Sequence, residues 1–316
     1  MKKRTKLTPT EQRNPRSRGL DLKSTLDILR TINREDATVA AALQRELPAI
    51  ARAVDAIAAA LRRGGRLIYI GAGTSGRLAA LDDAECPPTF GISPRQVQAV
   101  IAGGRRALTA AVEGAEDDAA AAARDLGARK ISSQDVIVGL TASGSTPYVL
   151  GALRYARRKG AFTIGITCSA RPLIRRETRI LVAPQVGPEV VAGSTRMKAG
   201  TAQKLVLNML STATMVKLGH VYDNWMINVA LTNSKLRRRA VRILEEAAGA
   251  SVSAAEHALR HAGHDLRVAL LMLKRGVTAT DARRRLKAAH GNLRIALGES
   301  RAPRRSAGKG GRTGHG

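Results

Sequence analysis

Aromatic residues are scarce in this sequence: Phe, Trp and Tyr together make up 2% of its 316 residues. Proteins that bind single-stranded nucleic acid commonly stack bases on aromatic rings, so this scarcity argues against such a platform. The hydrophobic fraction is an ordinary 44%, and we expect a folded core of Ala, Leu, Val and Ile. The length suits one large domain, or a domain of about 200 residues with a smaller companion.

Cysteine is rare as well, and long apolar runs are missing. Cys86 and Cys168 lack the spacing of metal ligands, and we interpret both as packing residues. No stretch approaches the ~20 apolar residues that cross a bilayer, and the start of the sequence is charged and polar, unlike a secretory signal. We therefore expect a cytoplasmic protein without membrane contact.

Acidic residues are outnumbered, with 25 Asp and Glu against 53 Lys and Arg, which gives a formal net charge of +28. Such an excess would suit nucleic acid. A good part of it, however, lies in residues 2–6 and 301–316, and no helix-turn-helix, zinc-finger or RRM signature accompanies it. We interpret it as solvated basic surface. A polyanion contact, or attraction for anionic substrates, is the alternative, and nucleic acid is an unlikely partner.

The hydrophobic pattern divides the chain into four parts. Residues 1–20 read as a basic arm. Helical apolar spacing begins at Asp21, and a domain with these N-terminal helices is predicted to run over residues 21–220. Residues 221–298 look all-helical and predict a small helical subdomain. Residues 299–316 carry Gly, Ser and basic residues without periodicity and are read as a disordered tail.

The middle of the chain predicts the fold class. Short apolar runs alternate with helical stretches; the runs lie at 66–70, 97–101, 135–140, 162–167 and 180–182, and the helical stretches at 108–126, 148–160 and 197–218. This alternation is typical of an α/β fold with a doubly wound parallel sheet. Such sheets bind ligands at the carboxyl ends of their strands.

Two strand-to-helix loops are candidate phosphate sites. The first is GAGTSGR (residues 71–77), in which Gly73, Thr74 and Ser75 offer backbone N–H groups and hydroxyls. It lacks a Walker lysine and, despite its glycine spacing, the acid of a dinucleotide fingerprint. The second is TASGSTP (residues 141–147), with the candidates Ser143, Ser145 and Thr146. Two such turns in one sheet favour a shared anion site over simple helix capping.

Carboxylates supply candidate proton-transfer groups. Glu85 is predicted to end a helix stopped by the prolines at 87 and 88, where the negative helix end favours a protonated carboxyl. Glu116 belongs to a cluster of four acids at 113–118, which could equally be solvated helix-end acids. The stretch 187–204 adds Glu189 and Ser194 as candidate substrate- or phosphate-binding residues rather than proton-transfer groups; the alternative there is an ordinary helix capped by Ser194 and its neighbour.

Taken together, these stretches resemble the N-acetylmuramic acid 6-phosphate etherases, a branch of the sugar isomerase (SIS) domain families. The resemblance covers residues 7–298 and rests most on ECPPTFG (85–91) and STRMKAGTAQK (194–204). The arm LTPTEQRNPRS (7–17) agrees with it. It implies an SIS fold and a cofactor-free, metal-free cleavage of a D-lactyl ether, giving N-acetylglucosamine 6-phosphate and D-lactate in cell-wall sugar recycling.

The resemblance also implies roles for the candidates. Glu85 matches the acid that protonates the departing lactyl oxygen and then activates water, and Glu116 matches a second acid for C2 proton abstraction or ring opening. The hydroxyl loops would hold the 6-phosphate. Family members are dimers with the site near the interface, which implies a homodimer in which Lys235 reaches the partner's site.

Some features depart from the family or leave alternatives open. Ser145 stands where the usual SGRTPY loop has arginine, which puts that contact in doubt; Asn228 replaces a common aspartate, and Asp83 adds a charge beside Glu85. A straight helix from Ser75 to Glu85 would rise about 15 Å, far from its own phosphate loop. The competing interpretations are a sugar-phosphate sensor, like the glucokinase regulatory protein, and an aldose–ketose isomerase.

Overall fold

The computed structural model describes residues 9–229, 231 and 233–299. The first eight residues of the expected arm and residues 300–316 of the expected tail lie outside this described part. The chain divides into two compact units, one up to Leu218 and one from Gly219. Within the described residues, no helix combines the length and apolar character needed to cross a membrane.

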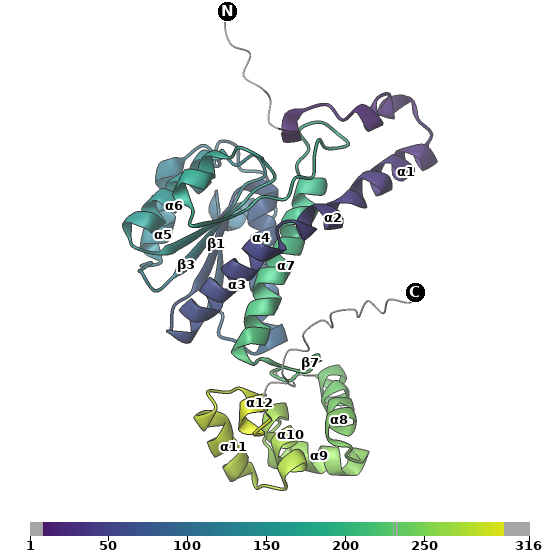
Figure 1. The fold of residues 1–316 in the computed structure, drawn as a ribbon, viewed down its shortest axis with the longest axis vertical. Coiled ribbons are helices and arrows are strands. Elements are labelled where there is room, and N and C mark those ends of the chain that lie inside the picture. The colour runs from purple at the N-terminus through teal and green to yellow at the C-terminus, as the bar shows by residue number, and fades with distance from the viewer. Residues whose placement is uncertain (1–8, 230, 232, 300–316) are drawn as a thin grey trace, which may run out of the picture. The chain divides into compact units, whose positions relative to one another are not determined.

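The first unit is built on a five-stranded sheet (Figure 1). Its strand order is β2-β1-β3-β4-β5, and every neighbouring pair is parallel. Gly71 at the end of β1 lies opposite Leu140 at the end of β3, so the loops that follow these strands leave the sheet side by side. The predicted α/β class is confirmed, with the strands at β1 (Leu67–Gly71), β2 (Val97–Ile101), β3 (Val136–Leu140), β4 (Phe162–Ile166) and β5 (Ile180–Val182).

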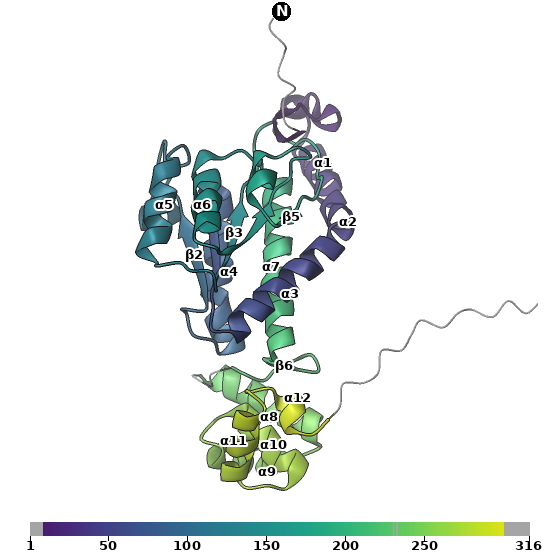
Figure 2. The ribbon, with the colours of Figure 1, turned by 60° about the vertical axis from the view of Figure 1, so that its left-hand side comes forward.

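Helices cover both faces of this sheet (Figure 2). Ile68, Ile70 and Ile137 point toward α5 and α6 and form an apolar core with them. Helices α3, α4 and α7 pack together on the other face. The α-helices of this unit are α1 (Thr25–Asp36), α2 (Thr38–Gln44), α3 (Leu47–Arg62), α4 (Gly73–Phe90), α5 (Ala119–Ala128), α6 (Pro147–Arg158) and α7 (Lys198–Leu218).

Short 3₁₀ helices link several of these elements. They are η1 (Pro9–Glu11), η2 (Pro15–Ser17), η3 (Leu20–Leu22), η4 (Gly104–Leu108) and η5 (Leu173–Glu177).

Two predicted helix limits are corrected. The helical stretch expected at 108–126 becomes a helix only at Ala119, because Gly114 adopts a left-handed φ of 70° and the Asp118 side chain caps α5. The prolines at 87 and 88 do not stop α4, which continues to Phe90. They fall in its last turn, where few backbone hydrogen bonds are lost, and Gly91 in the left-handed conformation ends the helix.

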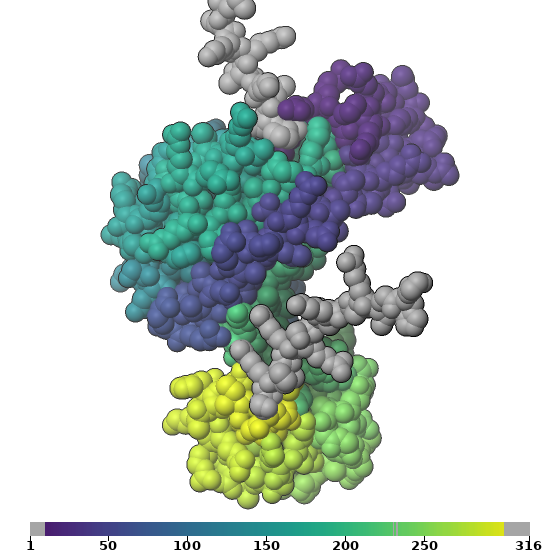
Figure 3. Space-filling view, in the orientation of Figure 1, coloured from purple at the N-terminus to yellow at the C-terminus, as the bar shows by residue number. Residues whose placement is uncertain are grey.

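The N-terminal segment is folded onto the unit rather than extended as an arm. The backbone N–H of Gly193 donates to the Thr10 carbonyl at 3.2 Å. Ser17 donates to the Val190 carbonyl at 2.7 Å, across 173 residues of sequence. In Figure 3 these first residues, drawn in purple, lie with α1 as a projection from the sheet domain.

The second unit is a helical bundle with a short hairpin that the sequence did not predict. Ile243, Leu259 and Leu270 are central members of its buried core. The hairpin pairs β6 with β7 in antiparallel fashion. Its elements are β6 (Val221–Tyr222), β7 (Trp225–Met226), α8 (Ser234–Ala248), α9 (Val252–His261), α10 (Leu266–Arg275), α11 (Ala279–Ala288) and α12 (Leu293–Ala296).

Candidate active site

A pocket of about 410 Å³ lies where the loops after β1 and β3 leave the sheet. This is the point at which the strand order reverses direction, the usual ligand position in a doubly wound sheet. The pocket draws residues from five separate segments of the chain. They are Glu11, Ala72, Gly73, Thr74, Ser75, Glu116, Asp117, Leu140, Thr141, Ala142, Ser143, Ser145, Thr146, Pro147, Gly193 and Thr195.

The first loop brings the start of α4 to the pocket. Gly71 and Gly76 approach so closely that a Cβ on Gly71 would lie 2.9 Å from the Gly76 nitrogen, which lets the helix turn directly off the strand. The first turn of α4 carries backbone N–H groups without helical partners, a natural site for an anion. Thr74 adds a half-buried hydroxyl, whereas the Ser75 hydroxyl donates to Gln203 of α7 at 2.8 Å.

The second loop is a compact cluster of hydroxyls at the start of α6. Thr141 and Thr146 share a hydrogen bond of 2.7 Å, and Ser145 donates to Ser143 at 3.1 Å. Gly144 has a φ of 76° and lies against Pro172, where a Cβ would come within 2.2 Å of the proline ring. The loop is therefore held in one shape, with its hydroxyls at the pocket wall.

Glu116 is attached to this second loop by its backbone. Its carbonyl accepts a hydrogen bond of 2.9 Å from the N–H of Tyr148, in the first turn of α6. Its exposed carboxylate lines the pocket together with Asp117. The structure thus joins Glu116 with the candidate residues of both loops, namely Gly73, Thr74, Ser75, Ser143, Ser145 and Thr146.

Glu85 does not line this pocket. It lies on α4 twelve positions beyond Gly73, a distance of about 18 Å along a regular helix. Its side chain is exposed. Because α4 continues past it, the argument that Glu85 stands at a negative helix end is also corrected.

Three further candidates are not found at the pocket. Ser194 lies between two pocket residues but does not line it, and α7 begins only at Lys198. Glu189 is fully buried, and its two oxygens accept the backbone N–H groups of Lys198 and Ala199, each at 2.9 Å. It therefore caps α7 in place of Ser194 and has no oxygen turned to a substrate. Lys235 is an exposed residue of α8 in the second unit.

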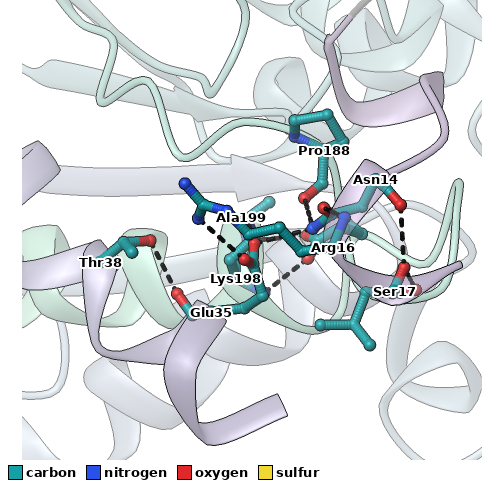
Figure 4. A network of polar contacts seen from close by, with 10 residues as sticks. Asn14, Arg16, Ser17, Glu35, Thr38, Pro188, Lys198 and Ala199 are labelled. Atoms are coloured by element: carbon teal, nitrogen blue, oxygen red, sulfur yellow. Dashed lines mark hydrogen bonds and ion pairs between the residues drawn. The ribbon is translucent and has the colours of Figure 1, made fainter. Parts of the chain in front are cut away.

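A buried ion pair fixes the wall beside the pocket (Figure 4). Lys198 donates to the Glu35 carboxylate at 2.6 Å, and both side chains are almost inaccessible. Asn14 donates to the same carboxylate at 2.7 Å, and Arg16 donates to its other oxygen at 3.0 Å. Burial opposes the charge of Glu35, but these three donors outweigh it and lower the pKa of Glu35 to about 2.

A second buried carboxylate, Asp82, lies between α4 and α7. It accepts hydrogen bonds of 2.9 Å from both Tyr69 and Ser211. Burial raises the pKa of Asp82 to about 6, although these two bonds favour its charged form. No sequence pattern distinguishes Asp82 from the nearby Asp83 and Glu85, so its burial was not predicted.

Glu11 is the pocket residue that the sequence analysis missed. It stood in a segment read as a basic arm, and its only sequence signal was the family-like run TEQRNP. No described group of three or more His, Cys, Asp or Glu side chains is arranged to hold a metal ion. The pocket therefore offers hydroxyl groups, backbone N–H donors and carboxylates.

The matches to family models identify the sheet domain as an SIS domain. Residues 49–157 match the glucokinase regulatory protein N-terminal SIS domain, and residues 109–213 match the SIS domain. Residues 223–295 match the C-terminal lid domain of glucokinase regulatory protein. Among solved structures, a phosphoheptose isomerase from Francisella tularensis has 19% identity and a TM-score of 0.46, covering 61% of this chain and all (100%) of that chain.

Curated relatives are much closer in sequence. The N-acetylmuramic acid 6-phosphate etherase of Yersinia pestis is 56% identical over 288 residues, which is 91% of this chain and 98% of that protein. The etherase of Yersinia pseudotuberculosis shows the same identity and coverage. The chain belongs to the N-acetylmuramic acid 6-phosphate etherase family.

Proposed function

We propose that this protein cleaves the D-lactyl ether of N-acetylmuramic acid 6-phosphate, giving N-acetylglucosamine 6-phosphate and D-lactate, in cytoplasmic recycling of cell-wall sugar. The observation that carries the proposal is the pocket of about 410 Å³, in which two hydroxyl-bearing helix starts face Glu116. Its occurrence in a chain 56% identical to curated etherases supports this particular substrate.

The 6-phosphate would bind where α4 and α6 begin. The first turn of α4 directs backbone N–H groups without helical partners toward the pocket, and both helices direct the positive end of their dipoles there. At α6, Pro147 has no N–H, and the Tyr148 N–H is already bonded to the Glu116 carbonyl. Thr74, Ser143, Ser145 and Thr146 add hydroxyl donors. These donors suit a phosphate dianion, and the carboxylates of the pocket suit the hydroxyl and amide groups of the sugar.

The reaction would be an elimination followed by a hydration. In the open-chain sugar, the C1 aldehyde acidifies the C2 proton. Glu116 would remove that proton or assist ring opening, the C3–oxygen bond would break, and D-lactate would leave with a proton from a carboxylic acid. Water then adds across the C2–C3 double bond, delivering hydroxyl to C3 and a proton to C2. Each positioned proton-transfer group contributes about 10²- to 10⁴-fold to the rate.

Glu85 would supply the acid from a second subunit. It is exposed on α4 and lies too far along that helix to serve its own pocket. The apolar side chains Leu22, Leu26 and Leu29 are 86%, 54% and 56% exposed, so the described residues of the first unit leave this η3–α1 face uncovered. A homodimer would cover such a face. We include Lys235 of the second subunit in this proposal as an added cation for the substrate.

Incubation with N-acetylmuramic acid 6-phosphate in H₂¹⁸O tests the function. The etherase releases D-lactate and places ¹⁸O on C3 of the sugar product. Formation of a ketose phosphate would instead indicate an aldose–ketose isomerase. Binding of the sugar phosphate without any product would indicate a sensor, and either outcome would overturn the proposal.

A further inference from the structure

Glu11 is a third carboxylate at the same pocket, and it comes from the N-terminal segment, far in sequence from Glu116 and Asp117. We propose that Glu11 binds the sugar part of the substrate by accepting hydrogen bonds from its hydroxyl or amide N–H groups. The inference rests on the proposed function for the identity of the sugar phosphate, and assigns to Glu11 the recognition of the sugar as opposed to the phosphate.

The Glu11 carboxylate lies directly against the loop that precedes α7. A Cβ placed on Gly193 would lie 3.2 Å from Oε2 of Glu11, and Gly193 has a φ of 78° that favours glycine. The Gly193 N–H donates to the carbonyl of Thr10, the residue before Glu11. The backbone beside Glu11 is therefore bonded to this loop, and Gly193 leaves room for the carboxylate next to it.

The segment that carries Glu11 is held by polar contacts on its far side. Asn14 donates to Glu35 at 2.7 Å and to the Pro188 carbonyl at 3.2 Å, and its own oxygen accepts from the Arg16 N–H at 3.0 Å. Ser17 donates to the Val190 carbonyl. These bonds tie residues 10–17 to the loop at 188–193, so Glu11 is presented by a fixed wall of the pocket.

The side chain of Glu11 takes no part in these hydrogen bonds. Within the described residues, no hydrogen bond or ion pair involves its side chain. Glu35, by contrast, binds Arg16 and Lys198. A carboxylate that lines a pocket and accepts no hydrogen bond from the described residues is available to a ligand.

The charge of Glu11 decides which part of the ligand it meets. An ionised carboxylate only accepts hydrogen bonds and repels a phosphate dianion. The sugar offers hydroxyl and amide N–H donors, and its phosphate offers none. A hydrogen bond to a charged group in a binding site is worth about 1.5–3 kcal/mol, or about 10- to 150-fold in affinity.

Binding measurements on Glu11→Ala separate the two parts of the ligand. Calorimetry with N-acetylglucosamine 6-phosphate should show affinity reduced about 10- to 100-fold. Inorganic phosphate, which competes for the same pocket, should bind unchanged or several-fold more tightly because a nearby negative charge is gone. Glu11→Gln, which keeps one accepting oxygen, should weaken the sugar phosphate less than Glu11→Ala does.

Asp21→Ala is the matched control, because it removes one exposed carboxylate from the same N-terminal segment outside this pocket. It should leave both affinities unchanged. Equal weakening of phosphate and sugar phosphate by Glu11→Ala would show a general disturbance of the pocket and overturn the inference, as would no change in either. These readouts need no turnover, so a wild-type protein that releases no D-lactate would sink the proposed reaction and leave the assignment of Glu11 intact.

Discussion

The ammonium group of Lys198, at the first position of α7, lies 2.6 Å from the carboxylate of Glu35, at the end of α1. Both groups are buried, and Glu35 binds Asn14 from the N-terminal segment with the same oxygen. One carboxylate therefore connects three parts of the chain, namely the N-terminal segment, α1 and α7. A charge pair removed from water is costly to break, because the remaining charge is left without a counter-ion.

Glu35→Gln should destabilise the protein by about 3–5 kcal/mol at neutral pH. Because the pKa of Glu35 is lowered to about 2, its contribution is fully present above the usual carboxyl pKa near 4.5 and is lost as the pH falls from there toward 2. The stability difference between wild type and variant should therefore shrink between pH 5 and pH 3. Urea unfolding across this range measures it, with Arg16→Ala, which removes only the exposed cation, as a control expected near 1 kcal/mol or less. A difference that does not change with pH would contradict the expectation.

Asp82 should have the opposite pH dependence. Its pKa is raised to about 6 from 3.8, so the folded state binds its proton more tightly than the unfolded state does. Stability is therefore lost as the pH rises from about 4 to about 6, by up to about 3 kcal/mol relative to a non-titrating side chain. Relative to wild type, the free energy of unfolding of Asp82→Asn should therefore be higher at pH 8 than at pH 4, and at pH 8 it can exceed that of wild type. Parallel curves of unfolding free energy against pH for wild type and Asp82→Asn would contradict this prediction. Asp21→Asn, at an exposed position, is the control for replacing an aspartate by asparagine.

The sequence was sufficient to predict the parts of the site that depend on local pattern and on strand order. Short apolar runs located β1 and β3, and in a doubly wound sheet their loops meet, so Thr74 and Ser143 were predicted to share one pocket. Glu116 was found as well, although it lies in a turn where a helix was expected, because Gly114 interrupts the helical pattern.

The residues that sequence reasoning misplaced depend on contacts between distant segments. Glu11 reaches the pocket because Thr10 pairs with Gly193, across more than half of the chain. Glu189 was taken for a substrate contact, but the chain folds back so that its carboxylate caps α7 nine positions later. No local periodicity encodes either contact. Only the packed structure distinguishes a carboxylate that holds a helix from one that faces a ligand.

Replacing Ser145 by arginine should increase the affinity for the phosphorylated substrate. Ser145 lines the pocket at the position where the family's loop commonly has arginine, and a guanidinium there can bind a phosphate through two parallel hydrogen bonds. Ser145→Arg should lower KM for N-acetylmuramic acid 6-phosphate by about 3- to 30-fold and make it more sensitive to salt. Steady-state kinetics at two ionic strengths measure both effects. Thr109→Arg adds the same charge at an exposed position outside the pocket and should change neither; a raised KM in Ser145→Arg would show that the loop has no room for the side chain.

Glu85 and Glu116 allow a direct test of whether one site is shared between two subunits. Glu85→Gln and Glu116→Gln should each reduce D-lactate release by about 10²- to 10⁴-fold while N-acetylglucosamine 6-phosphate still binds. If the two variants are mixed and allowed to form dimers at random, half of the dimers contain one chain of each kind. If each site takes Glu116 from one chain and Glu85 from the other, one of the two sites in such a dimer has both glutamates and the other has neither.

The mixture should therefore recover about a quarter of wild-type activity, because half of the sites in half of the dimers are complete. If both carboxylates acted within one chain, every site in the mixed dimer would lack one of them, and mixing would restore nothing. Mixing either variant with itself under the same conditions controls for activity gained during the exchange. If heterodimers form but no activity is recovered, Glu85 does not act in the partner's active site. The proposed reaction would then lack the acid that we assign to lactate departure.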